Sequence, residues 1–227
     1  MTFTAAQTRT WTKLYDLLEP RVLAHGSKDY VTGLKQLDLP KDEIPSIAYL
    51  NEKITPATGW KTVRTSVRYS DAETWYREFA KKHFLVTDYI REEKELEFTP
   101  EPDMFHDIFG HLPFLMIPAY TEFEEMFAPA FLRADEEQRE NIKRLAWYSA
   151  EFGLVRQDGE LKVFGAGLLS SAGEIDRVMS GGTPVHPFTV ESVIAVPKSV
   201  WEFNNVLFVA DDIDHYKREL ARYFDGL

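Results

Sequence analysis

Two histidines five residues apart constrain this chain more than any other feature. His106 and His111 lie in the stretch TPEPDMFHDIFGHLP, which is otherwise rich in apolar and aromatic residues. On an ideal α-helix this spacing turns the second side chain by about 140° from the first, so both rings reach one ion only if the helix unwinds between them. Gly110 and Pro113 are typical of a helix end. We therefore expect a short helix that ends at Gly110 and presents both histidines to a metal ion.

Glu151 is the expected third ligand. It is the only charged residue in the run LAWYSAEFGLV, residues 145–155, and a carboxylate in such a setting needs a partner, a shifted pKa or a metal ion. Two histidines and a carboxylate form the facial triad of non-heme Fe(II) oxygenases, which leaves positions open for dioxygen and a co-reactant.

A zinc-dependent hydrolase and a non-catalytic binding protein are the alternatives. Zinc also accepts two histidines and a glutamate, but the usual hydrolase motif places the histidines four apart with a glutamate after the first. This chain has a spacing of five, and Asp107 follows His106. A protein that had lost its chemistry would be expected to have replaced a ligand, and all three ligands are present.

Three motifs resemble those in the catalytic domain of the pterin-dependent aromatic amino acid hydroxylases, of the bacterial phenylalanine hydroxylase type. They are PEPDMFHDIFGHLP, WYSAEFGL and FGAGLLSS, in the family's order and with about its spacing. The resemblance starts near Thr58 and reaches the C-terminus, whereas residues 1–55 show no such likeness. It implies Fe(II), a tetrahydropterin and dioxygen, and hydroxylation of the ring of a free aromatic amino acid. Phenylalanine is the expected substrate, and tyrosine, tryptophan or another ring position stays an alternative.

The resemblance also assigns residues to the amino acid substrate. Arg91 is expected to pair with the substrate carboxylate, because a guanidinium forks onto a carboxylate, although the residues alone indicate only a surface salt bridge. Trp147 is expected to hold the aromatic ring. The remaining substrate-binding candidates are Thr99, Asp103, Gly167, Ser170 and Ser171. Ser171 is also expected to hydrogen-bond a liganding histidine, and the residues alone favour equally a turn with Ser171 as a helix cap.

The expected pterin site departs from the family's pattern. The usual Pro-Val-x-Gly stretch is replaced by RTSVRYSD, residues 64–71. Trp75 is expected to replace the aromatic platform for the pterin ring, and Asp107 stands where the family has a glutamate. Val67 completes the candidate contacts, and Ala146 stands where a tyrosine is common, which enlarges the pocket. The resemblance therefore indicates a divergent member of the family.

Hydrophobic periodicity predicts a mainly helical α+β fold, and the resemblance implies a basket of helices with small peripheral sheets around one iron pocket. Helices are expected over 8–23, 30–37, 44–51, from Ser70 through His83, over 118–134 with an interruption at Pro129, over 135–151, 173–179 and 190–195, and from Asp211 to Phe224. Strands are expected over 60–69, in a hairpin over 154–164 with its turn at Asp158-Gly159, and within 199–210.

Length and composition limit the class of protein. A chain of 227 residues that is 44% hydrophobic can bury the core of one domain. We expect a single catalytic domain over 1–227, in which a helical extension, 1–55, packs on the core, 56–227. The net charge of −11 argues against nucleic acid or anionic membrane as a partner. With no cysteine, no recognisable secretory signal and no long apolar run, the simplest expectation is a cytoplasmic monomer.

Overall fold

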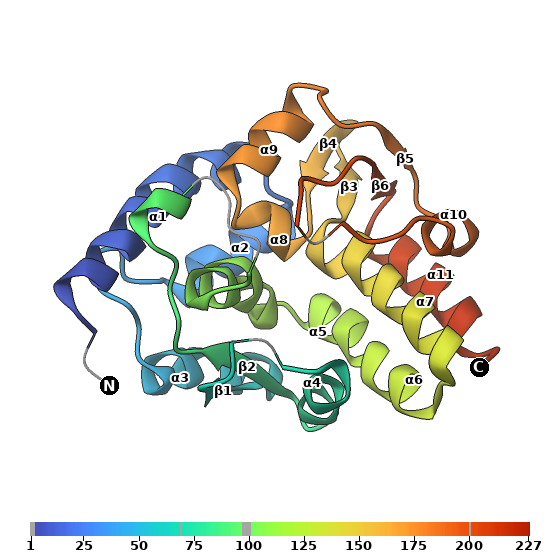
Figure 1. Cartoon of the computed structure of the whole chain (residues 1–227), viewed down its shortest axis with the longest axis horizontal. Helices are drawn as coiled ribbons and strands as arrows, with labels where there is room; N and C mark the ends of the chain where they lie inside the picture. The colour runs from blue at the N-terminus through green and yellow to red at the C-terminus, as the bar shows by residue number, and fades with distance from the viewer. Residues whose placement is uncertain (1–2, 69, 97–100, 200) are drawn as a thin grey trace.

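The computed structural model describes residues 3–68, 70–96, 101–199 and 201–227 and confirms a mainly helical α+β fold with small sheets (Figure 1). The α-helices are α1 (Ala5–His25), α2 (Lys28–Leu37), α3 (Ile47–Thr58), α4 (Ala72–Phe79), α5 (Pro118–Glu125), α6 (Phe127–Arg133), α7 (Glu136–Ala146), α8 (Ala166–Leu169), α9 (Ala172–Met179), α10 (Val190–Ile194) and α11 (Ile213–Phe224). Two 3₁₀ segments, η1 (Glu93–Glu95) and η3 (Leu112–Met116), and two π-helical turns, η2 (His106–His111) and η4 (Trp147–Glu151), complete the helical structure.

The first two helices pack directly on the segment that carries the histidines. The ring of Trp11, in α1, meets that of Phe105 edge-on, with 5.1 Å between the ring centres. The buried hydroxyl of Tyr30, in α2, donates a hydrogen bond of 2.6 Å to the backbone carbonyl of Phe109. Both contacts involve side chains of the main hydrophobic core. The N-terminal helices therefore support the wall of the site from behind.

A two-stranded parallel sheet lies along one side of the molecule, at the bottom of Figure 1. It pairs β1 (Lys61–Thr65) with β2 (His83–Thr87). The predicted strand over 60–69 is confirmed for β1, while Tyr69 lies outside the described residues. The expected helix through His83 is wrong, because α4 ends at Phe79 and His83 begins β2. The buried run FLV after His83 is typical of a strand in a parallel sheet.

The four-stranded sheet has the order β4-β3-β6-β5 and lies on the opposite side of the molecule (Figure 1). Its strands are β3 (Leu154–Gln157), β4 (Glu160–Val163), β5 (Val185–Pro187) and β6 (Leu207–Ala210). The predicted hairpin is confirmed, and Asp158 and Gly159 both have positive φ, 55° and 80°, as a two-residue type I′ turn requires. Of the segment 199–210, only β6 is a strand, and Trp201 before it is 71% exposed. Val200 lies outside the described residues.

Several helix boundaries differ from the predictions for local reasons. The predicted helix over 118–134 breaks at Met126, and Pro129 lies in the first turn of α6, where its missing N–H costs little. Asp71 rather than Ser70 caps α4, and Asp212 rather than Asp211 caps α11. In both helices the aspartate next to the predicted cap accepts the hydrogen bond from the first turn. No described helix is both long enough and apolar enough to cross a bilayer.

Candidate metal centre and active site

The two histidines lie on one turn of π-helix. In η2 the hydrogen bonds join residues five apart, which brings such residues onto about the same face, and the Nε2 atoms of His106 and His111 are 3.1 Å apart. The expected helix end at Gly110 is therefore wrong, since the chain continues through Gly110 into η3. Gly110 instead permits close packing, because a Cβ there would lie 2.8 Å from the backbone oxygen of Ala166 in α8.

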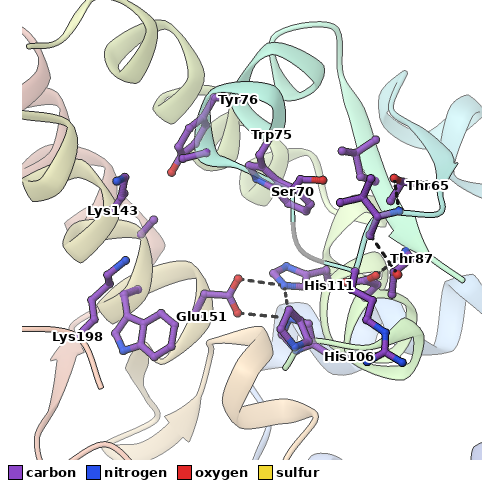
Figure 2. A pocket seen from close by; sticks show the side chains of 18 residues that line it. Thr65, Ser70, Trp75, Tyr76, Thr87, His106, His111, Lys143, Glu151 and Lys198 are labelled. Atoms are coloured by element: carbon purple, nitrogen blue, oxygen red, sulfur yellow. Dashed lines mark hydrogen bonds and ion pairs between the residues drawn. The ribbon is translucent and has the colours of Figure 1, made fainter. Parts of the chain in front are cut away.

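Glu151 completes the cluster from a second π-helical turn, η4, which extends α7. Its Oε1 lies 3.2 Å from Nε2 of His111, and its Oε2 lies 3.6 Å from Nε2 of His106. Figure 2 shows the carboxylate pointing at both imidazoles. Each residue offers one ligand atom, and these atoms lie within 4.8 Å of one another. Two imidazole nitrogens and one carboxylate oxygen that converge in this way fit a divalent metal of the iron or zinc type.

Charge coupling within the cluster prepares it for a cation. Burial lowers the pKa of His106 to about 4, so this ring is neutral near pH 7. Burial opposes the protonation of His111, but the Glu151 carboxylate outweighs it and raises the pKa of His111. Burial likewise opposes ionisation of Glu151, yet the charge and hydrogen bond of His111 lower the pKa of Glu151 to about 2. Without a metal, Glu151 and His111 therefore form an ion pair that a cation can replace.

Ser170 fixes the tautomer of His106. Its Oγ lies 2.8 Å from Nδ1 of His106 and 2.9 Å from the backbone oxygen of Ala166. The single hydroxyl proton is donated to the Ala166 carbonyl, so the hydroxyl accepts a hydrogen bond from Nδ1–H of His106. Nε2 then keeps its lone pair toward the cluster, and this kind of support orients metal-binding imidazoles.

Ser171 and Gly167, near Ser170 in the chain, both contact other parts of the protein. Ser171, which was expected to bond a liganding histidine, caps α9 through Glu174 N, and Ser170 makes the histidine contact instead. Gly167 is buried where a Cβ would lie 2.7 Å from the Phe152 ring. Neither Gly167 nor Ser171 lines the cavity next to the cluster.

That cavity has a volume of about 320 Å³ and opens beside the three ligands (Figure 2). Its described lining residues are Thr65, Val67, Arg68, Ser70, Ala72, Trp75, Tyr76, Leu85, Thr87, Pro102, His106, Asp107, His111, Lys143, Ala146, Trp147, Glu151 and Lys198. It is large enough for small organic ligands beside a metal ion. The predicted pterin contacts Trp75, Asp107 and Val67 all lie on its wall.

Comparisons with known proteins identify the family of this site. The sequence profile described as biopterin-dependent aromatic amino acid hydroxylase matches residues 1–227. The chain belongs to the biopterin-dependent aromatic amino acid hydroxylases. The match includes residues 1–55, so the expectation that the likeness begins near Thr58 is wrong. The function class is therefore iron- and pterin-dependent hydroxylation of aromatic amino acids, and the alternatives of a zinc hydrolase and a non-catalytic binding protein are excluded.

Three relatives illustrate the breadth of the family. Phenylalanine-4-hydroxylase of Caulobacter vibrioides is 31% identical over 228 residues, which are 100% of this chain and 77% of that protein. Tyrosine 3-monooxygenase of Rattus norvegicus is 29% identical over 97% of this chain and 45% of its own length. The structure of Chromobacterium violaceum phenylalanine hydroxylase with bound iron(III) and oxidised cofactor 7,8-dihydrobiopterin aligns with a TM-score of 0.91 at 28% identity, covering 99% of this chain and 83% of that one.

The predicted substrate arginine of this hydroxylase is buried and held by an aspartate. Arg91 donates to Asp103 from Nε and Nη2, both at 2.9 Å, and its backbone N–H donates to the same carboxylate. Burial opposes ionisation of Asp103, but the Arg91 charge holds the pKa of that carboxyl below its ordinary value. Nη1 of Arg91 is buried with no hydrogen-bond partner among the described residues. Thr99 lies outside the described residues.

The predicted aromatic wall is held by residues that sequence reasoning missed. Trp147 donates from Nε1 to Oδ1 of Asn204 at 2.9 Å. Asn204 in turn donates from its backbone N and its Nδ2 to Oε1 of the buried Glu174, both at 3.2 Å. The sequence offered only a weak signal, because Glu174 is one of three charged residues in AGEIDRVM, residues 172–179. The ring that faces the cavity is thus fixed by a buried polar chain.

Asp107 of this hydroxylase is a buried carboxyl at the cavity wall. Its Oδ2 accepts a hydrogen bond of 2.8 Å from the backbone N–H of Thr87 in β2. Burial raises the pKa of Asp107 to about 7. The Trp75 ring lies nearby on α4, packed on Phe79 and Phe84 with ring centres 5.0 and 5.2 Å away. Trp75 is therefore a rigid aromatic surface and Asp107 a polar group at its side.

Proposed function

We propose that this hydroxylase inserts one oxygen atom from dioxygen into the ring of free phenylalanine, using iron held by His106, His111 and Glu151 and a reduced pterin. The observation that carries the proposal is the convergence of three ligand atoms, within 4.8 Å of one another, at the wall of a cavity that also holds an aromatic platform. Relatives named phenylalanine-4-hydroxylase support phenylalanine, and the match to tyrosine 3-monooxygenase makes tyrosine the second candidate.

Bound iron and reduced pterin together supply the activation of dioxygen, and the protein supplies position and charge. Ser170 keeps the Nδ1 proton on His106, so Nε2 is free for the metal. His111 gives up its proton when a cation replaces it beside Glu151. His106, His111 and Glu151 would hold the iron as two imidazoles and one carboxylate, a ligand set that leaves room for dioxygen and a co-reactant, and all three residues line the cavity.

The amino acid would lie between Arg91 and Trp147. Nη1 of Arg91 supports this, because it is buried with no partner among the described residues, and a guanidinium nitrogen in that setting favours an anionic partner. Asp103 holds the guanidinium in place through Nε and Nη2 and leaves Nη1 for the substrate carboxylate. The Trp147 ring, fixed by Asn204, would pack against the aromatic ring of the substrate. Thr99, Gly167, Ser170 and Ser171 stay predictions as direct substrate contacts.

The pterin would stack on Trp75 and present its polar edge to Asp107. The ring of Trp75 lines the cavity and is packed from behind, which favours stacking of a flat heterocycle. A carboxyl with a pKa of about 7 can be protonated or ionised near neutral pH, and a pterin ring offers both donors and acceptors. Val67 lines the same cavity. We also infer that the enzyme acts as a monomer.

The test of this proposal is aerobic turnover of phenylalanine, tyrosine and tryptophan by Fe(II)-loaded protein, with and without tetrahydropterin. Products are identified by mass and NMR. We expect pterin-dependent gain of one oxygen atom, fastest with phenylalanine. A faster reaction with tyrosine or tryptophan would overturn the assignment of phenylalanine as the substrate, while the assignment of iron and pterin would stand. Bound iron with no product from any of the three would overturn the function.

A further inference from the structure

Two lysines line the cavity on the side away from the histidines. Lys143 comes from α7, and Lys198 from the segment between α10 and β6. Figure 2 shows both across Glu151 from the two imidazoles. Both are half-buried, and Nζ of Lys198 lies 5.9 Å from the centre of the Trp147 ring. In a chain with a net charge of −11, this cavity wall is a local concentration of positive charge.

Neither lysine is neutralised strongly by the protein. Lys143 pairs with Glu140 three residues earlier on α7, at a partly exposed position, where such a pair contributes little. Within the described part of the chain Lys198 makes no ion pair, and burial lowers its pKa. Holding a cation in a partly desolvated place is unfavourable unless an anion meets it. Together the two ammonium groups favour an anionic group of a ligand.

The position of the two lysines indicates that they contact the cofactor rather than the amino acid substrate. The substrate carboxylate is already assigned to Arg91, which does not line this cavity. A pterin carries its amino and oxo groups on the pyrimidine edge and its side chain on the opposite edge. If the ring stacks on Trp75 with the pyrimidine edge toward Asp107 and Thr87, the side chain runs toward the lysines. In Figure 2 Thr87 and the lysines lie at opposite ends of the cavity, with Trp75 between them.

We propose that Lys143 and Lys198 bind a phosphate or carboxylate on the side chain of the reduced pterin. The inference rests on the pterin cofactor of the proposed function. It adds that the side chain of this pterin carries a negative charge. An ammonium forms charge-assisted hydrogen bonds with either anion. A pterin with a neutral side chain would leave Lys198 without an ion pair among the described residues, and Lys143 with only its partly exposed pair to Glu140. The cavity of this chain therefore favours a pterin with an anionic side chain over one with a neutral side chain, such as biopterin.

The decisive ligands are dihydroneopterin and its monophosphate, which differ only in the charged group. Binding to the metal-free protein is measured by calorimetry in low salt, without turnover. We expect the monophosphate to bind about tenfold more tightly, as two partly screened ion pairs allow, and the advantage to shrink in high salt. Dihydrofolate, with carboxylates on its side chain, distinguishes a carboxylate site from a phosphate site.

The controls are lysine variants. In the double variant Lys143→Gln with Lys198→Gln, the monophosphate should lose its advantage while dihydroneopterin binds as before, which shows an intact cavity. Lys28→Gln, at an exposed ion pair with Asp158, should change neither affinity. Equal affinities of the unmodified protein for dihydroneopterin and its monophosphate would overturn the anion site. So would a tighter binding of the monophosphate that persists in the double variant. Neither result would affect the proposed function. If a carboxylated phenylalanine bound more tightly than phenylalanine while the two pterins bound equally, the lysines would belong to the substrate site. That result would overturn the cofactor claim. Binding of no pterin at all would overturn the proposed function as well.

Discussion

At the scale of single residues, the hydroxyl of Ser170 decides whether His106 offers a lone pair to the metal. Ser170→Ala removes the acceptor for Nδ1–H, and we expect Fe(II) affinity to fall about 10- to 100-fold, as for other such supporting contacts. Anaerobic metal titration measures it. Ser171→Ala is the matched control, because Ser171 caps α9 and its loss should cost about 1 kcal/mol of stability. Unchanged iron affinity in Ser170→Ala would contradict the assigned tautomer.

The protonation of His111 predicts how iron binding depends on pH. Because Glu151 raises the pKa of His111, protons compete with iron at and below that raised value. His106, with a pKa of about 4, does not compete near neutral pH. Apparent Fe(II) affinity should therefore increase with pH and level off above the raised pKa, with about one proton released per iron. Calorimetry in buffers of different ionisation enthalpy counts that proton, and a pH-independent affinity would rule the ion pair out.

At the scale of elements, the π-helical turn η2 depends on close packing against α8. Gly110→Ala places a Cβ 2.8 Å from the backbone oxygen of Ala166, so the turn or α8 must move. We expect a loss of about 1–3 kcal/mol in the free energy of unfolding and weaker iron binding, because both ligands lie on this turn. Thermal unfolding and metal titration measure the two effects. Gly226→Ala, with its nearest atom at 3.5 Å, should change neither, and equal behaviour of the two variants would contradict the packing role.

Periodicity and local turn chemistry were sufficient for most elements. The hairpin at Asp158-Gly159 and the helices with a side chain at the N-cap follow from signals within a few residues. What failed depends on distant contacts. The sequence gives no local sign that Gly110 meets Ala166, so the histidine segment was read as a helix end rather than a π-helical turn. For the same reason β2 was missed, since its short buried run has the apolar character of either a strand or a helix.

The site shows the same division. The three metal ligands could be predicted because their residue types and spacing carry the chemistry. The serine that bonds a liganding histidine was placed one residue away, at Ser171, because the turn between α8 and α9 decides which of two adjacent hydroxyls points toward the histidine. Asn204 and Lys198 come from the irregular segments 195–199 and 201–206, where no periodic pattern indicates a direction. Such residues are visible only once the chain is folded.

At the scale of the whole molecule, the metal joins two parts of the chain. His106 and His111 belong to the segment supported by the N-terminal helices, and Glu151 belongs to η4, which follows α7. A ligand that binds only the folded state stabilises it by about 4 kcal/mol at a thousand times its Kd. Anaerobic Fe(II) should therefore raise the Tm of the protein by several degrees. Glu151→Ala should abolish most of this increase, and an equal increase in that variant would place the metal elsewhere.

The most direct test of the central claim is turnover of phenylalanine under isotopically labelled dioxygen, with Fe(II) and reduced pterin present. We predict that the hydroxylated product carries one labelled oxygen atom, that one pterin is oxidised per product, and that His111→Ala forms none. Product without the label, or product formed equally well without pterin or by His111→Ala, would contradict a pterin-dependent monooxygenase centred on His106, His111 and Glu151.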